Sequence, residues 1–399
     1  MKNPRTWAQI DLGKVQANIE TIKRSLKPDT NILAVVKADA YGHGAIAVAR
    51  TALFSGATML GVGDSTEALE LREAGIKAPV IILGSICDRE IDCIVRNNIT
   101  PTIHSVERLS DLSRAAAKHN VKLHVNVMID TGMGRVGVRP DSALKLVSAV
   151  CEDPNLELLG VSTHFSCAHF EDLSFAREQL SKFDMVIAEM EEAGIRPPVL
   201  HAANTAALFA LPEAHFDMVR PGAGIYGIDP GNLSPLGIKL TPVLEWKTQV
   251  VYWKWVEEGT PVGYNMAYRA PRRTKIATLP VGYDDGYSFS FSNTAEVLYK
   301  GRRCRVVGNV TMDYIMIDVG EVPEVKVGDE ITLLGTDGEA EIETTELARL
   351  MGAPPYAVTS LLGKRVKRIY TDSSGTEINI GAVSFTEIHA GTHDALAIK

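Results

Sequence analysis

Apolar runs alternate with amphipathic segments from about residue 30 to residue 230. Eight of the runs have the length and β-branched content of strands, and helical spacing of apolar residues fills the gaps. The candidate strands are Asn31–Lys37, Thr58–Gly63, Val80–Leu83, Thr100–Ile103, Lys122–Ile129, Leu156–Thr163, Pro198–His201 and Phe216–Val219. Ile32–Val36 and Leu158–Val161 are almost wholly apolar, as strands buried on both faces should be. The pattern predicts a parallel (β/α)8 barrel.

One helix between these strands carries clear boundary signals. Asp64 and Glu67 have capping-box spacing, and Gly75 follows the last apolar position. We therefore predict a helix over Asp64–Ala74.

The pattern changes after Pro230, where the segments become short, β-branched and bounded by Gly, Pro, Asn or Asp. They predict a mostly-β domain. Its candidate strands are Thr248–Trp255, Thr274–Leu279, Ala295–Tyr299, Cys304–Val307, Ile315–Val319, Glu330–Leu334 and Arg365–Tyr370, with a helix at Glu343–Met351. We place the barrel at residues 1–235 and the β domain at 236–399, with the first residues of the chain available to pair with the β domain.

Charge and cysteine content narrow the possible partners. The 399 residues carry a formal net charge of −8, which argues against nucleic acid or an anionic membrane as the main partner. The five cysteines are odd in number and lack CxxC spacing, which is typical of reduced thiols in a cytosolic protein without a metal site. The first residues lack an apolar signal region, and no apolar run approaches 18 residues, so we predict a soluble cytoplasmic protein.

Lys37 is the first candidate for chemistry. It ends the apolar strand, and reactive groups of a parallel barrel lie where strands end. A partly desolvated amine has a lowered pKa and becomes competent for Schiff-base chemistry. The alternative is a lysine that simply leaves the core for solvent.

The string AVVKADAYGHG around Lys37 resembles the pyridoxal-phosphate attachment segment of the alanine racemases. The resemblance runs from TWAQIDL to RVKRIY and includes, in order, IDTGMGRVG, THFS, HAANTAA, VRPGAGIYG, LPVGYDDGY, VGNVTMDY and YAVTS. It implies an enzyme that interconverts L- and D-alanine with pyridoxal 5'-phosphate and supplies D-alanine for peptidoglycan. It also implies that Lys37 binds the cofactor, that Tyr41 helps to hold its phosphate, and that the protein forms homodimers with shared active sites.

VRPGAGIYG places Arg220 at a strand end and Gly222 and Ala223 in the turn after it. Backbone N–H groups of such a turn can approach a phosphate, although most glycine-rich turns are only turns. By the resemblance, Arg220 faces the pyridine nitrogen of the cofactor. A guanidinium can only donate, so it keeps that nitrogen unprotonated and favours racemisation over transamination.

Three further residues match positions of the family around the cofactor. Asn204 and Thr205 belong to HAANTAA, and the Thr205 hydroxyl is a candidate phosphate donor where the family commonly has serine. Thr205 could also be a helix N-cap, since capping and phosphate binding can coincide at one residue. His164 matches a histidine that lies beside the cofactor ring and contacts the arginine, although an isolated histidine is more often structural.

Racemisation needs a proton removed from one face of a planar carbon and another delivered to the opposite face, which two bases do without rotating the intermediate. PVGYNMAY resembles the segment with the second catalytic tyrosine and assigns that role to Tyr264. A tyrosine with the ordinary pKa of about 10 is a poor base and needs a cation or donor beside it. Without the resemblance, Tyr264 would be read as an amphipathic packing residue.

Four more residues take roles from the resemblance. Met312 offers its backbone N–H to the substrate carboxylate, with Asp313 beside it, and Tyr283 lines the entrance to the site. Tyr356 contributes to phosphate binding and restrains the second base. Each also has a structural interpretation, as a core residue, a turn residue or packing tyrosines.

Met128 departs from the family pattern. Many members have there a lysine that becomes carbamylated and bonds the arginine of DTGMGR, here Arg135, which faces substrate and cofactor. Methionine offers no anion, and a buried guanidinium without one costs several kcal/mol. A small anion such as chloride, a neighbouring side chain or water is then required. Asn126, two residues before Met128 on the same strand face, is the candidate side chain.

The nearest rivals are a racemase for serine or a broader set of amino acids and a barrel-type pyridoxal-phosphate decarboxylase. A single-domain pyridoxal-phosphate-binding protein without racemase activity would lack the β domain that brings Tyr264. A purely structural barrel would leave Lys37, Arg220 and Tyr264 coinciding by chance.

Overall fold

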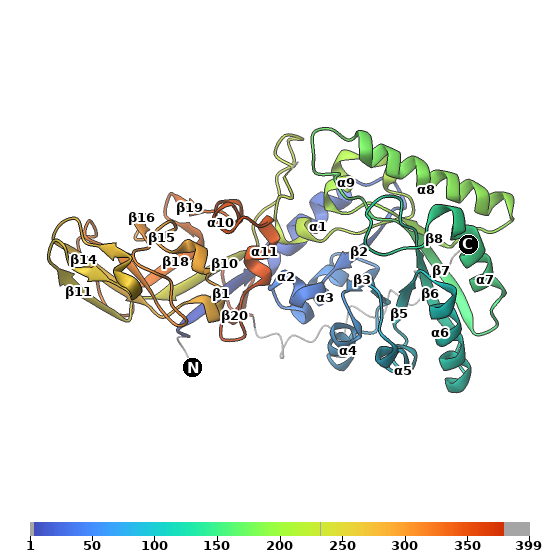
Figure 1. Cartoon of the computed structure of the whole chain (residues 1–399), viewed down its shortest axis with the longest axis horizontal. Coiled ribbons are helices and arrows are strands. Elements are labelled where there is room, and N and C mark those ends of the chain that lie inside the picture. Colours follow the sequence, from blue (N-terminus) through green and yellow to red (C-terminus); the bar gives the residue numbers. More distant parts are fainter. Residues whose placement is uncertain (1–3, 232, 379–399) are drawn as a thin grey trace.

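The computed structural model describes residues 4–231 and 233–378. The molecule is elongated, with a helix-covered barrel at one end and a β-rich domain at the other (Figure 1). Asn232 and the last residues of the predicted β domain, 379–399, lie outside the described residues.

Eight parallel strands form one sheet, in the order β8-β7-β6-β5-β4-β3-β2-β9. Their bounds are β2 (Asn31–Val35), β3 (Met59–Val62), β4 (Val80–Ile82), β5 (Thr100–Ile103), β6 (Leu123–Met128), β7 (Leu156–Ser162), β8 (Val199–His201) and β9 (Met218–Val219). The ends of the order meet where the Asp217 N–H donates to the Leu200 carbonyl and the Arg220 N–H to the Ala203 carbonyl. The barrel and the mostly-β second domain are thereby confirmed.

Helices cover the outside of this sheet (Figure 1). They are α1 (Leu12–Arg24), α3 (Ala45–Phe54), α4 (Ser65–Glu73), α5 (Ile91–Arg96), α6 (Val106–His119), α7 (Pro140–Glu152), α8 (Ser174–Glu192) and α9 (Thr205–Ala210). A short segment, α2 (Lys37–Tyr41), separates β2 from α3.

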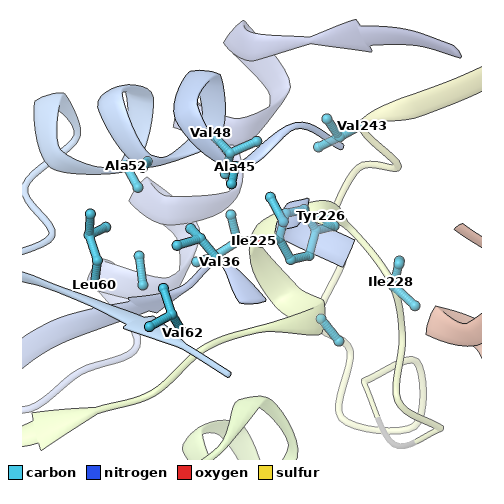
Figure 2. Close-up of a cluster of buried hydrophobic side chains, with 14 of the residues drawn as sticks. Val36, Ala45, Val48, Ala52, Leu60, Val62, Ile225, Tyr226, Ile228 and Val243 are labelled. Atoms are coloured by element: carbon cyan, nitrogen blue, oxygen red, sulfur yellow. The ribbon is translucent and has the colours of Figure 1, made fainter. Parts of the chain in front are cut away.

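The two faces of β2 contact two separate cores. Leu33 and Val35 point into the barrel and pack with Met59, Ile81 and Met218. The alternate residues Ile32, Ala34 and Val36 pack in the larger core on the side of the helices. Figure 2 shows Val36 next to Ala45 and Val48 of α3. Each fully buried aliphatic side chain contributes about 1.5–3 kcal/mol, so an apolar run buried on both faces holds the strand end firmly.

The β domain has a seven-stranded sheet in the order β16-β15-β18-β10-β1-β20, with β19 paired to β18. Two smaller sheets, β11-β14-β17 and β12-β13, complete it. The bounds are β1 (Thr6–Asp11), β10 (Leu244–Gln249), β11 (Tyr252–Val256), β12 (Pro261–Val262), β13 (Tyr268–Arg269), β14 (Thr274–Leu279), β15 (Glu296–Tyr299), β16 (Arg302–Arg305), β17 (Ile315–Asp318), β18 (Glu330–Asp337), β19 (Ala340–Ile342) and β20 (Lys367–Thr371), with helices α10 (Thr344–Met351) and α11 (Pro355–Ser360). The first strand of the chain thus lies inside the sheet of the second domain, between β10 and β20.

The single strand predicted over Thr248–Trp255 was wrong. The chain changes sheet at Val250 and Val251, whose N–H groups donate to Asp329 and Thr278 carbonyls of different sheets. Both valines continue the apolar pattern, so the pattern alone does not reveal the break.

Candidate active site

Lys37 follows β2 at the carboxyl end of the barrel, where the strand ends two residues earlier than predicted. The next four residues, Ala38 to Tyr41, have φ between +51° and +55° and form a left-handed turn. None of them is glycine, and left-handed backbone costs such residues about 1–2 kcal/mol each. A turn of this kind persists only where the surroundings hold it.

Hydrogen bonds from several elements hold the turn. The Ala40 N–H donates to the Val36 carbonyl at 2.8 Å and the Gly44 N–H to the Asp39 carbonyl at 2.8 Å. The Asp39 carboxylate accepts the Ala45 N–H at the start of α3. A Cβ at Gly42 would overlap the Thr359 carbonyl of α11, so α11 closes over the turn. The backbone after Lys37 is therefore tied to both domains.

Glu67 forms part of this support in a way that the predicted capping box did not foresee. Asp64 caps α4 as predicted, because its carboxylate accepts the Thr66 and Glu67 N–H groups. The Glu67 side chain, however, accepts the Gly63 and Ala38 N–H groups, each at 2.7 Å, instead of the Asp64 N–H. Its carboxylate therefore links α4 to the turn after Lys37.

The Lys37 amine lies in a half-buried position among charged groups. Burial is the largest cause that lowers its pKa, the Arg135 guanidinium lowers it further, and the Glu67 carboxylate raises it. A lowered pKa increases the share of neutral amine near pH 7, which is the form that acts as nucleophile or base.

Arg220 is 4% exposed and lies at the centre of a hydrogen-bond network inside the carboxyl end of the barrel. Its Nη1 donates to the His201 carbonyl at 2.8 Å, and its Nη2 donates to the carbonyls of Thr163 at 2.7 Å and Ala202 at 2.9 Å. Burial lowers its pKa to about 10, so the guanidinium stays charged at neutral pH.

Two histidines contact the same guanidinium. His164 Nδ1 lies 3.2 Å from Nη2, and His201 Nδ1 lies 3.1 Å from Nη1. Burial and then Arg220 lower the pKa of His164 to about 3 and hold the pKa of His201 well below its usual range. Both rings are therefore neutral and accept from Arg220. The motif HAANTAA begins with His201, but the sequence did not lead us to predict that His201 supports Arg220.

A group of hydroxyl and N–H groups lies beside this network. Asn204, not Thr205, is the N-cap of α9, which corrects the N-cap interpretation of Thr205. The Thr205 hydroxyl instead accepts the N–H groups of Gly222 and Gly224, each at 3.1 Å. Among the described residues, none accepts the N–H of the buried Ala223.

Two tyrosines complete this corner. A Cβ at Gly222 would lie 2.7 Å from the Tyr41 hydroxyl, so any side chain at this position would require the phenol to move. The Tyr41 ring meets the Tyr356 ring of α11 edge to face at 6.0 Å between centroids. Burial and then Tyr356 raise the pKa of Tyr41 to about 12, so Tyr41 is a neutral hydrogen-bond donor.

Of the partners considered for Arg135, the Asn126 alternative was wrong. The Asn126 amide donates to Ser162 and Thr102, and its oxygen lies 2.9 Å from His201 Nε2, so every polar atom is engaged inside the barrel. Arg135 is exposed in the single chain. The argument that a buried Arg135 guanidinium requires a partner therefore does not apply there. Met128 is buried, with its sulfur 3.7 Å from the Ser162 hydroxyl.

Tyr264, Tyr283, Met312 and Asp313 form a second group on the β domain. Among the described residues, no hydrogen bond or ion pair joins them to Lys37 or Arg220. Three of the side chains are strongly exposed: Tyr264 at 72%, Met312 at 52% and Tyr283 at 46%. Within one chain, this second group is therefore not joined to Lys37 and Arg220 in a single site.

The chain matches the models of the alanine racemase N-terminal domain over residues 10–230 and of the alanine racemase C-terminal domain over residues 243–370. The chain belongs to the alanine racemase family. It is 41% identical to the alanine racemase of Halothermothrix orenii over 93% of this chain and 98% of that protein. It is 41% identical to that of Desulfovibrio desulfuricans over 92% and 98%.

Solved structures of alanine racemases have the same fold. That of Clostridium difficile superposes with a TM-score of 0.90 at 31% identity, covering 95% of this chain and 98% of that one. The structure from Bacillus anthracis with bound L-Ala-P gives 0.89 at 34% identity over 94% and 97%. That from Bartonella henselae, with covalently bound pyridoxal phosphate, gives 0.82 at 27% identity over 92% and 100%. The resemblance to the alanine racemases and the predicted enzyme class, an isomerase that racemises alanine, are confirmed.

Within residues 4–231 and 233–378, no helix has both the length and the apolar composition that a membrane-spanning segment needs.

Arg365, which the sequence reading missed, connects the loops of the second group. Its guanidinium pairs with Asp313 at 2.7 Å, Asp284 at 2.9 Å and the buried Asp285 at 3.1 Å. It thereby joins the loop of Met312 to the loop of Tyr283. Arg365 is the first residue of RVKRIY, the segment that ends the family resemblance, and this position was the available signal for its role.

Replacing Arg365 by alanine should leave the Asp285 carboxylate buried without its cation and loosen both loops. We expect the free energy of unfolding, from urea denaturation, to fall by about 1–3 kcal/mol. KM for alanine should rise more than kcat falls if this loop binds substrate, as the family resemblance implies for the Met312 N–H. Arg349→Ala, on the exposed side of α10, is the control. An unchanged KM in a folded Arg365→Ala protein would contradict the role.

Proposed function

We propose that the protein racemises alanine with pyridoxal phosphate, using Lys37 as the base on one face and Tyr264 of a second subunit as the base on the other. The observation that carries the proposal is the arrangement at the carboxyl end of the barrel. A half-buried lysine with a lowered pKa and a buried arginine both act electrostatically on His164, and a corner of hydroxyl and N–H donors lies at the same end of the barrel.

The residues of this corner fit pyridoxal phosphate. Tyr41, Tyr356, Thr205 and the free N–H of Ala223 would hold its phosphate, since they offer donors without a cation. Lys37 supplies the amine that binds its aldehyde. When bound, the cofactor withdraws electrons from the α-carbon of an amino acid, which makes the α-proton acidic enough to remove.

Arg220 would hold the ring nitrogen through its remaining donor. Its two Nη groups already donate to carbonyls and histidines, so among the described residues only Nε–H is left without an acceptor. A guanidinium cannot give up a proton to the nitrogen at working pH, so electron withdrawal stays moderate. That restraint favours return of the proton to the α-carbon over transamination.

A second copy of the chain would complete the site. Large apolar and aromatic side chains are exposed around the second group, which is unusual unless a partner covers them. They are Tyr264, Met266, Tyr283, Phe289, Met312, Tyr314, Tyr356 and Leu361. Tyr356 also touches Tyr41, so this apolar surface reaches the edge of the cofactor corner. A homodimer would bring Tyr264 and Met312 of one subunit over Lys37 of the other.

Tyr264→Phe should impair α-proton exchange of one alanine enantiomer far more than of the other, on the order of 10²-fold or more. The two-base scheme requires this asymmetry, because each base serves one face. Exchange in deuterated water, followed separately for each enantiomer, measures it. A loss confined to KM would indicate a binding role instead.

Mixing tests whether the site is shared. In a heterodimer of Lys37→Ala and Tyr264→Phe subunits, one site carries both changes and the other carries none. After random subunit exchange, about a quarter of all sites should be intact and activity should return to about that level. If each site were built within one chain, the mixture would stay inactive.

Chiral analysis of the purified protein with pyridoxal phosphate and L-alanine, L-serine or L-lysine tests the proposal as a whole. We expect D-alanine as the main product. D-serine in excess would favour the serine racemase, and carbon dioxide release from lysine would favour the decarboxylase.

A further inference from the structure

Glu67 accepts hydrogen bonds from the backbone just after two neighbouring strands, β2 and β3, at the mouth of the barrel. Its Oε1 accepts the Ala38 N–H, directly after Lys37, and its Oε2 accepts the Gly63 N–H, directly after β3. One carboxylate therefore joins the carboxyl ends of two neighbouring strands at the point where Lys37 leaves the barrel. The Ala38 N–H is also the first of the left-handed turn.

We propose that Glu67 is a positioning residue for Lys37. Its carboxylate holds the turn after Lys37 against β3, and as a neighbouring anion it keeps the Lys37 amine over the mouth of the barrel. The inference rests on the proposed function, because it takes Lys37 as the lysine that binds the cofactor. It adds a residue of α4 to the machinery that was assigned to the strand ends.

A carboxylate is the side chain that suits this position. Two N–H groups point at the same side chain, one at each oxygen. Glutamine has one oxygen and one NH2 group, so one of its two ends would set a donor against an N–H. Aspartate is one methylene shorter and cannot reach both N–H groups from the same helix position.

The charge of Glu67 acts on Lys37 together with other groups. The Arg135 guanidinium, from the loop after β6, and His164, at the end of β7, also act electrostatically on or with Lys37. Asp64 of the same helix and Tyr226 lie near Glu67. Among these groups of the described residues, Glu67 is the anion that acts on the amine, and it raises the pKa of Lys37 against burial and Arg135. Loss of its charge should shift titration of the amine to lower pH.

The test compares Glu67→Gln with Glu70→Gln, an exposed glutamate on the same helix. Pyridoxal phosphate is added to the cofactor-free proteins over a range of pH, the product is reduced with borohydride, and the modified lysine is mapped. We expect the pH midpoint of incorporation at Lys37 to fall by about one unit in Glu67→Gln. It should stay unchanged in Glu70→Gln.

Hydrogen exchange of the amides from Ala38 to Tyr41 gives a second readout that needs no cofactor. We expect their exchange to become about tenfold faster in Glu67→Gln, because the anchor of the turn is lost. In the loaded enzyme, kcat should fall about tenfold, mainly for the enantiomer whose proton exchange does not depend on Tyr264, with little change in KM.

Unchanged midpoint and unchanged exchange in Glu67→Gln would overturn the inference. If that variant does not fold, Glu67→Asp decides, since it keeps the charge but not the reach. Its turn amides must then exchange faster, and normal exchange would equally overturn the inference. Mapping of the cofactor to a lysine other than Lys37 in the unaltered protein would instead reject the proposed function.

Discussion

Replacing Lys37 by alanine should lower racemisation by at least about 10³-fold and abolish any borohydride-reducible bond between pyridoxal phosphate and the protein. The amine that follows β2 has a lowered pKa and lies at the same end of the barrel as the donors proposed to hold the cofactor phosphate. Methyl cannot replace it as nucleophile or base. Chiral analysis and peptide mapping after reduction measure the two effects.

Lys77→Ala is the matched control for this change. Lys77 is exposed and precedes β4, at the opposite end of the barrel. It should keep both activity and the reducible bond. Normal activity in Lys37→Ala, or a reduced cofactor on another lysine of that variant, would remove Lys37 from the mechanism.

Replacing Arg220 by lysine should lower kcat on the order of 10²–10³-fold, the usual effect of losing one positioned donor at a reacting group. Lysine keeps the charge but cannot donate in a fork to three carbonyls and also face the cofactor ring. We also expect a loss of about 3 kcal/mol in the free energy of unfolding. A glutamate at this position would set a carboxylate against the same carbonyls, so lysine gives the clearer test.

Arg72→Lys separates stability from catalysis. Arg72 also clamps carbonyls of neighbouring loops, those of Ile76, Ala78, Asn97 and Asn98, but at the amino end of the barrel. The Arg72→Lys protein should have a lower free energy of unfolding and an unchanged kcat per folded molecule. Equal loss of kcat in both variants would mean that Arg220 acts only through folding.

Much of the fold was predictable because local signals and tertiary structure agree there. Apolar runs such as Ile32–Val36 are buried on both faces, so their composition reports directly on the barrel. Asp64 was predictable as a cap because a helix start needs an acceptor whatever surrounds it. The residues proposed to hold the cofactor were found through motifs, since isolated lysines, histidines and tyrosines have commoner structural roles.

Other features depended on partners that are distant in sequence. The strand predicted over Thr248–Trp255 divides because Asp329 and Thr278 offer acceptors in two different sheets. Asn126, one of the partners considered for Arg135, is instead engaged by Ser162 and His201 inside the barrel. No local pattern encodes which acceptor a buried amide will meet.

Local sequence patterns therefore establish the alternation of strands and helices, the β-rich second domain and the order of the motif residues along the chain. Contacts between distant segments are needed for the left-handed turn after Lys37, the hydrogen bonds of Glu67 with Ala38 and Gly63, and the hydrogen bonds of Thr205 with Gly222 and Gly224. The physical reason is the same in each case. A backbone strained by about 1–2 kcal/mol per residue, or a buried donor, is stable only where acceptors from other elements converge on it.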